Sequence, residues 1–191
     1  MNIGLYFGTF NPIHIGHMAI ANYMLEFTEL DQLWFVVSPQ SPFKQKQSML
    51  DDYQRLELVN RAIGDDHRLK ASSIEFKMPK PSFTIDTLTY LKEEYPANQF
   101  WLIMGSDNLE HFHKWKNSEL ILENHPILVY PRPGFDPSSV IASGNIHIVD
   151  APIMEISATF IRESLKEGKD IRYFIPGKAW QYIEEMNFYR K

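Results

Sequence analysis

Short, uninterrupted apolar runs recur along the chain, and each is bounded by residues that favour turns. Runs of this kind are typical of strands that are buried on both faces of a parallel sheet. The strands predicted in this way cover residues 3–7, 33–37, 100–104, 127–130 and 146–149. The stretches between them carry apolar residues at helical spacing, so the pattern indicates alternating strands and helices.

The helical spacing is clearest over 51–63, where Gly64 follows as a stop signal. Further helices are predicted over 14–25, 85–95, 158–167 and 178–186. Ser157 is a suitable N-cap for the helix over 158–167, and Gly168 is suited to end it. Strands that alternate with helices predict an α/β fold with a doubly wound parallel sheet, whose ligand sites lie at the carboxyl ends of the strands. Two C-terminal helices follow the last strand.

Composition narrows the kind of protein. The 191 residues are 44% hydrophobic and 23% charged, which predicts one folded domain over 1–191. With a formal net charge of −5, a general polyanion-binding surface is disfavoured, so no nucleic-acid partner is expected. The absence of cysteine excludes disulfides, thiolate metal sites and cysteine nucleophiles. We expect no membrane association and a cytoplasmic location, because no signal peptide or long apolar segment is recognisable.

The segment 8–17, GTFNPIHIGH, carries the strongest chemical signal and lies between the first strand and the first helix. Gly8 lets the backbone approach a ligand closely, and the amides of a strand-to-helix turn are anion donors. His14 and His17 are three residues apart, so a helix places both imidazoles on one face at its positive end. Two histidines at this spacing alone also fit structural histidines or a metal pair. Gly8, Gly16 and the strand context favour phosphate binding.

This segment resembles the signature of the nucleotidylyltransferase superfamily, whose His-x-Gly-His element is shared with class I aminoacyl-tRNA synthetases. A second segment, 156–162, resembles the Ile-Ser-x-Thr-x-Ile-Arg element that closes over the triphosphate in these transferases. Ser157 would cap a helix, Thr159 would lie in its first turn, and Arg162 would offer a planar fork of donors to phosphate. Taken alone, this segment also fits a capped surface helix with an exposed arginine. The resemblance implies a Rossmann-like sheet of the nucleotidylyltransferase type.

Intermediate segments resemble bacterial nicotinate-nucleotide adenylyltransferases in particular. Lys44 follows the second strand and would lie beside the phosphates, and Thr84 belongs to a version of a Ser-Tyr-Thr-x-Asp-Thr element. Asp107 follows the strand that ends near Gly105 and would accept hydrogen bonds from ribose hydroxyls. Trp115 occupies the position where that family stacks a tryptophan on the pyridine ring. Two departures from the family pattern are Ala158 in place of a second serine and Phe83 in place of tyrosine; neither removes a group that phosphate chemistry needs.

The resemblance implies transfer of the adenylyl group of ATP to nicotinate mononucleotide, with release of pyrophosphate. The catalytic residues it implies are His14, His17, Lys44 and Arg162. The ATP-binding residues it implies are Gly8, Thr9, Phe10, His14, His17, Gly105, Asp107, Ser157, Thr159 and Arg162. The mononucleotide-binding residues it implies are Lys44, Thr84, Trp115 and Arg132, which belongs to a version of the family's Arg-Pro-Gly turn. Mg²⁺ is expected through the ATP phosphates and not in a site of protein ligands.

Three alternatives remain open at this point. The first is a phosphopantetheine adenylyltransferase or another mononucleotide adenylyltransferase: phosphopantetheine enzymes share both end motifs, although Thr84, Asp107 and Trp115 match the nicotinate-nucleotide branch better. A class I aminoacyl-tRNA synthetase is disfavoured because the lysine-rich second signature is absent. A nucleotide sensor without catalysis would keep the fold, but the candidate reactive groups are all present. The sequence leaves the oligomeric state open, a homo-oligomer included.

Overall fold

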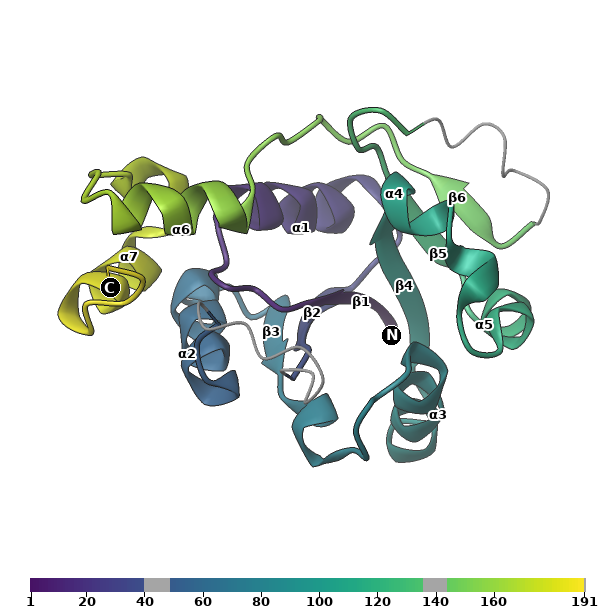
Figure 1. Ribbon diagram of the computed structural model, residues 1–191. Coiled ribbons are helices and arrows are strands. Elements are labelled where there is room, and N and C mark those ends of the chain that lie inside the picture. The colour runs from purple at the N-terminus through teal and green to yellow at the C-terminus, as the bar shows by residue number, and fades with distance from the viewer. Residues whose placement is uncertain (40–48, 136–143, 191) are drawn as a thin grey trace.

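The computed structural model describes residues 1–39, 49–135 and 144–190. Its centre is a six-stranded sheet in the order β3-β2-β1-β4-β5-β6, and every pair of neighbouring strands is parallel (Figure 1). The strands are β1 (Asn2–Gly8), β2 (Gln32–Val37), β3 (Leu69–Ser72), β4 (Gln99–Gly105), β5 (Ile127–Tyr130) and β6 (Ile146–Ile148). The strand order reverses between β1 and β4, and ligands of such sheets bind at the carboxyl ends beside this reversal.

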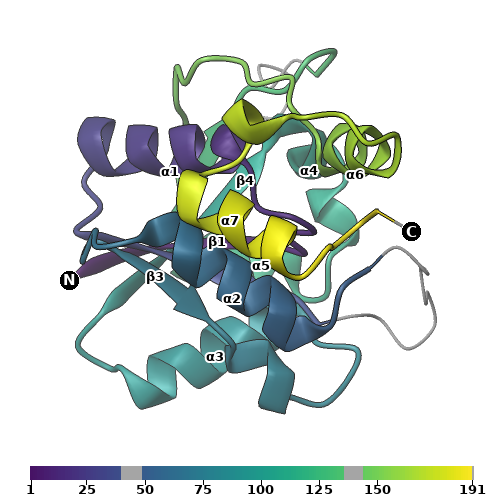
Figure 2. The same ribbon diagram turned by 90° about the vertical axis from the view of Figure 1, so that its left-hand side faces the viewer.

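Helices cover both faces of the sheet (Figures 1 and 2). The α-helices are α1 (Ile15–Phe27), α2 (Asp52–Ile63), α3 (Thr84–Glu94), α4 (Ser106–Leu109), α5 (Ser118–Asn124), α6 (Ala158–Lys166) and α7 (Gly177–Glu185). Short 3₁₀ turns are η1 (Ile74–Lys77), η2 (Phe112–Lys114) and η4 (Arg172–Phe174). Because side chains alternate along β1, Tyr6 packs with α1, α2, α6 and α7 on one face, while Leu5 packs with α3 and α5 on the other.

The doubly wound parallel sheet and the C-terminal helices are confirmed, and each predicted helix is present to within one or two residues at either end. One strand prediction is wrong in its burial: β6 is an edge strand, and Ile148 is 38% exposed. The sequence analysis also missed β3, whose sequence LKAS has no continuous apolar run. Over the described ranges, we find no helix with the length and apolar character of a membrane span.

Candidate active site

The turn that follows β1 is shaped by an aromatic side chain. Phe10 adopts a positive φ of 44° and is only 2% exposed, with its ring edge-on to Tyr6 and Phe35. A Cβ atom at Gly8 would lie 2.9 Å from the Phe10 ring, so glycine is needed for this close packing. The ring of Phe10 also meets His17 edge-on, with centroids 5.1 Å apart. The turn is therefore anchored in the core by the Phe10 ring.

The two motif histidines lie side by side at the start of α1. His14 is the N-cap and His17 is the third helical residue, and their rings stack with centroids 3.7 Å apart. The backbone N–H of His14 donates to Nδ1 of His17 over 3.3 Å. A neutral imidazole that accepts at Nδ1 carries its proton on Nε2, which fixes His17 as an Nε2–H donor. The expected pair at a positive helix end is present.

Burial keeps both imidazoles neutral. Desolvation first, and the positive charge of Arg132 second, lower the pKa of His14 from 6.5 to about 4. The pKa of His17 is lowered well below its ordinary value by burial first, and then by His14 and Arg132. Neutral imidazoles can donate to phosphate oxygens but carry no fixed charge. The positive charge of the site must come from elsewhere.

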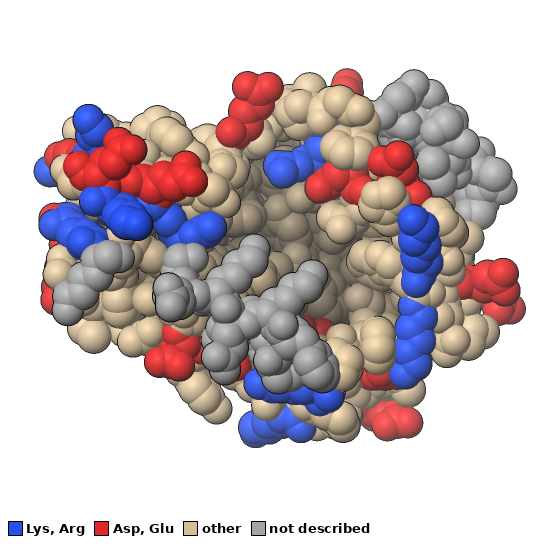
Figure 3. Space-filling model, in the orientation of Figure 1, with Lys and Arg blue, Asp and Glu red and all other residues tan. Residues whose placement is uncertain are grey.

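A cleft of about 240 Å³ opens beside these histidines. Its wall is formed by β1 and the end of β5, by α1 and α4, and by the segment before α6, and the face that contains it is hollowed at its centre (Figure 3). The lining residues include His14, His17, Asp107, Arg132 and Ser157. Residues predicted from four separate segments of the sequence are therefore brought to one cleft at the reversal of the sheet.

Asp107 and Arg132 face each other in this cleft. Arg132 Nε lies 3.9 Å from Asp107 Oδ1, and both side chains are about one-third exposed. Asp107 Oδ1 itself is buried and has no hydrogen-bond partner among the described residues. A Cβ atom at Gly105 would lie 2.4 Å from that oxygen and 2.8 Å from Arg132 Cγ. Glycine at 105 thus makes room for a carboxylate oxygen that is available to accept a hydrogen bond.

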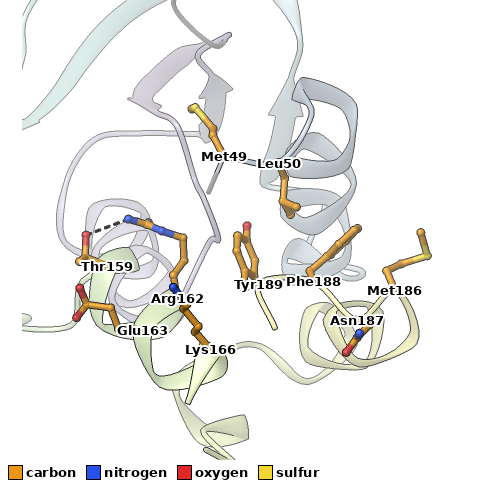
Figure 4. A pocket seen from close by; sticks show the side chains of 10 residues that line it. All are labelled: Met49, Leu50, Thr159, Arg162, Glu163, Lys166, Met186, Asn187, Phe188 and Tyr189. Atoms are coloured by element: carbon orange, nitrogen blue, oxygen red, sulfur yellow. Dashed lines mark hydrogen bonds between the residues drawn. The ribbon is translucent and has the colours of Figure 1, made fainter. Parts of the chain in front are cut away.

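The second motif contacts the first directly. Ser157 caps α6 as predicted, because its Oγ accepts from the backbone N–H of Phe160 at 3.1 Å. Arg162 donates from Nη1 to the carbonyl oxygen of Asn11 at 2.8 Å, and from Nη2 to Thr159 Oγ1 at 3.1 Å. Arg162 is thus tied to the N-terminal turn and is not a free surface side chain. Thr159 and Arg162 line a second cavity of about 590 Å³ between α6 and the C-terminal segment (Figure 4).

Arg55 is a residue that the sequence analysis missed. It is fully buried and donates to three carbonyl oxygens, those of Thr9 at 2.5 Å, Ser38 at 2.8 Å and Leu50 at 3.1 Å. Its charge is paired with Asp52 at 2.5 Å. The available signal was its position on the apolar face of α2, three and four residues before Leu58 and Val59, which are buried. A charged residue on a buried helix face is expected to be paired and hydrogen-bonded inside the protein.

Of the predicted acceptor residues, Arg132 lines the 240 Å³ cleft, whereas Thr84 and Trp115 lie on neighbouring elements outside it. Thr84 is the first residue of α3, and Trp115 is half-buried against Phe112, with ring centroids 5.5 Å apart. Lys116 joins the two elements, because its Nζ lies 2.8 Å from a carboxylate oxygen of Asp86. Neither Thr84 nor Trp115 lines the cleft of the histidines. Lys44 lies outside the described residues.

The fold and the cleft define a nucleotide-binding α/β protein of the nucleotidylyltransferase class. The cytidylyltransferase-like family model matches residues 5–164. A Flavobacterium johnsoniae protein named "probable nicotinate-nucleotide adenylyltransferase" is 56% identical, with 100% of both chains covered. A Cytophaga hutchinsonii protein of the same name is 48% identical, over 99% of this chain and 98% of the relative. The chain belongs to the cytidylyltransferase-like family and, within it, to the nicotinate-nucleotide adenylyltransferases.

A solved structure agrees with this fold. The Plasmodium falciparum nicotinic acid mononucleotide adenylyltransferase complexed with NaAD superposes with a TM-score of 0.79. The alignment covers 98% of this chain and 97% of the other, at 22% identity. At this level of identity, the likeness supports the fold and does not transfer individual site residues.

Proposed function

We propose that the protein transfers the adenylyl group of ATP to nicotinate mononucleotide, giving nicotinate adenine dinucleotide and pyrophosphate. The observation that carries the proposal is the stacked pair His14 and His17 at the N-terminus of α1, in a cleft at the carboxyl edge of the sheet. Relatives that match the whole chain at 56% identity carry the name of this activity. The site offers the donors that such a transfer needs.

The chemistry places modest demands on the protein. An oxygen of the mononucleotide phosphate attacks the α-phosphorus of ATP in line, and the bond from that phosphorus to the pyrophosphate oxygen breaks. Because the nucleophile is already an anion, no general base and no covalent enzyme intermediate are required. The protein must hold two polyanions together and stabilise the charge that develops on the α-phosphate and on the leaving group.

The geometry suggests a division of roles among the cleft residues. His17 would donate from Nε2 to the α-phosphate oxygens in the transition state, with His14 beside it. The backbone of Gly8, Thr9 and Phe10 would approach the phosphates, and Gly105 and Asp107 would receive the ribose hydroxyls of ATP. Ser157, Thr159 and Arg162 would hold the β- and γ-phosphates, because they lie at the start of α6 and Arg162 meets the first motif.

Mg²⁺ would enter with ATP as part of the substrate. Within the ranges that the structure describes, no group of three or more histidine or carboxylate side chains is arranged to hold a metal ion. We propose that the ion is held mainly by phosphate oxygens and water. Such an ion would neutralise charge on the β- and γ-phosphates. The histidines would then donate hydrogen bonds to oxygens of the α-phosphate.

The acceptor side of the site rests on Lys44, Thr84, Trp115 and Arg132. Arg132 lines the cleft and can meet the mononucleotide phosphate from the end of β5. The link between Asp86 and Lys116 places the Thr84 and Trp115 elements next to each other, as a shared pocket for one ring would require. An indole face that meets a positively charged pyridine ring gives stacking and cation–π attraction together.

One assay tests the proposal. Purified protein with ATP and Mg²⁺ is offered nicotinate mononucleotide, nicotinamide mononucleotide or phosphopantetheine, and pyrophosphate release is measured for each. We expect release with nicotinate mononucleotide, together with a dinucleotide product on chromatography. Release with phosphopantetheine alone would make the protein a phosphopantetheine adenylyltransferase. No release with any acceptor, while ATP still binds, would favour a nucleotide sensor.

A further inference from the structure

After α7, residues 187–189 form a turn that contacts the N-terminal motif. After α7, Asn187 and Tyr189 adopt φ angles of 54° and 63°, in the left-handed region that residues other than glycine rarely occupy. Between them, Phe188 is 7% exposed and packs edge-on against Tyr182, with centroids 5.3 Å apart. Two unfavourable backbone conformations in a tail persist only when the surrounding contacts impose them.

Tyr189 donates a hydrogen bond from its hydroxyl to Asn11 Oδ1 over 2.7 Å, across 178 residues of sequence. The same oxygen accepts from the backbone N–H of Leu50 at 3.2 Å, and the Asn11 side chain is only 6% exposed. Burial raises the pKa of Tyr189 well above its ordinary value, so its hydroxyl stays protonated and remains a donor. Figure 4 shows Tyr189 and Arg162 on the wall of the same cavity.

Asn11 is the point where three distant segments meet the phosphate-binding turn. Its side-chain oxygen accepts a hydrogen bond from the Tyr189 hydroxyl, and its carbonyl oxygen accepts one from Arg162. His14 lies only three residues further along, at the cap of α1. A small shift of Asn11 therefore moves both the imidazole pair and the arginine of the second motif. A displacement of about 1 Å at a reacting centre can lower turnover substantially.

We propose that Tyr189 is a positioning residue for adenylyl transfer, because its hydroxyl fixes Asn11 and, through Asn11, the turn that carries the histidines. The inference rests on the proposed function for its kinetic readout. Tyr189 touches no reacting atom. Its hydroxyl links the segment after α7 to the N-terminal motif, so this segment supports the proposed active site.

The test is Tyr189→Phe, which removes one hydroxyl and keeps the ring. The matched control is Tyr182→Phe, which removes a hydroxyl from a half-buried tyrosine on α7 that packs against Arg61 and Phe188. We expect Tyr189→Phe to lower kcat by about three- to tenfold, since the lost donor leaves Asn11 with a weaker hold. The KM for the acceptor and the thermal midpoint should match those of the control. A purely structural role would instead lower the thermal midpoint and leave kcat unchanged.

A second readout does not depend on activity. Backbone hydrogen exchange is measured for the peptide that spans the turn and the start of α1, in the wild type and both variants. Tyr189→Phe should exchange faster there, and Tyr182→Phe should not. The proposal is overturned if Tyr189→Phe matches the control in either kcat or exchange. If the wild type makes no dinucleotide, the proposed function fails, and the exchange result alone then decides whether Tyr189 holds the turn.

Discussion

The guanidinium of Arg162 lies 2.8 Å from the backbone carbonyl oxygen of Asn11, a residue 151 positions earlier in the chain. This hydrogen bond joins the two motifs that the sequence offers as separate signals. It leaves the remaining donors of the guanidinium for Thr159 and for a ligand. In the proposed role, Arg162 would contact a triphosphate and hold the N-terminal turn with one planar group, which an ammonium cannot do.

We predict that Arg162→Lys is strongly impaired. Lysine keeps the charge, but a point charge does not reach the Asn11 carbonyl, Thr159 and a phosphate at once. The measurement is steady-state kinetics with varied ATP, in which kcat/KM for ATP should fall by about tenfold or more. Arg172→Lys is the control, because Arg172 is an exposed arginine that pairs with Asp170. Equal activity of the Arg162→Lys and Arg172→Lys proteins would make Arg162 a surface residue without a role in the reaction.

His17→Ala should lose turnover while ATP binding changes little. The Nε2–H of His17 is oriented by the His14 backbone and is expected to meet charge that appears only in the transition state. Removal of one such donor typically costs about 10²–10³ in kcat. Turnover is measured beside calorimetric ATP affinity, with His67→Ala at an exposed turn as the control. A folded His17→Ala protein with the turnover of the control would end this assignment.

The fold was predictable because its strongest signals are local. Buried parallel strands are continuous apolar runs, and helix stops such as Gly64 and Gly168 take positive φ angles that suit glycine. β3 gave no such signal, because its sequence LKAS has no continuous apolar run and only Ser72 of its four residues is buried. β6 looked like a buried strand, yet at the edge of the sheet Ile146 is only half-buried and His147 and Ile148 are exposed. Pattern alone does not give a strand's place in the sheet.

Site residues that belong to a motif could be predicted from the sequence. Residues that support the site through long-range contacts could not. The positions of His14, His17 and Ser157 follow from their spacing beside a strand end or a helix start. Arg55 and Tyr189 act through backbone and side-chain contacts that only the folded chain creates. Periodicity places Arg55 on the buried face of α2, but it does not identify the carbonyl oxygens that accept its hydrogen bonds. Tyr189 sits in a tail with no motif at all.

Folding stability should fall as the pH drops below neutrality, in part because of His14. Its pKa is about 4 in the folded protein against 6.5 when exposed, so the unfolded chain binds more protons between these values. Stability therefore rises with pH across that window and is lost as pH falls through it. The loss assigned to His14 is about 1.4 kcal/mol per pH unit, on the order of 3 kcal/mol in total.

The measurement is urea unfolding of the wild type and His14→Gln at several pH values between 4 and 7. The difference between the two free energies of unfolding isolates His14 from the carboxylates, which titrate in both proteins. We expect the free energy of unfolding of His14→Gln, relative to that of the wild type, to rise steadily as the pH falls. Parallel curves would mean that His14 is protonated as readily in the folded protein as in the unfolded chain.

Trp115 is predicted to select the acceptor. It is half-buried beside Phe112, and Lys116 and Asp86 tie its segment to the start of α3, where Thr84 lies. An indole face against a positively charged pyridine ring contributes about 0.5–2 kcal/mol. Trp115→Ala should therefore raise the KM for nicotinate mononucleotide several-fold and leave the KM for ATP nearly unchanged. Both constants are measured on one preparation.

The competing account is that Trp115 only packs against the core, since it contacts the cluster formed by α3 and α5. In that case its loss lowers the thermal midpoint and weakens the binding of both substrates together, because a packing defect is not specific to one ligand. Trp115→Phe separates the two accounts further: it keeps a flat ring for stacking but loses part of the packed volume. A near-normal KM for the mononucleotide with a lowered midpoint in Trp115→Phe, and a raised KM in Trp115→Ala, is the result that stacking requires.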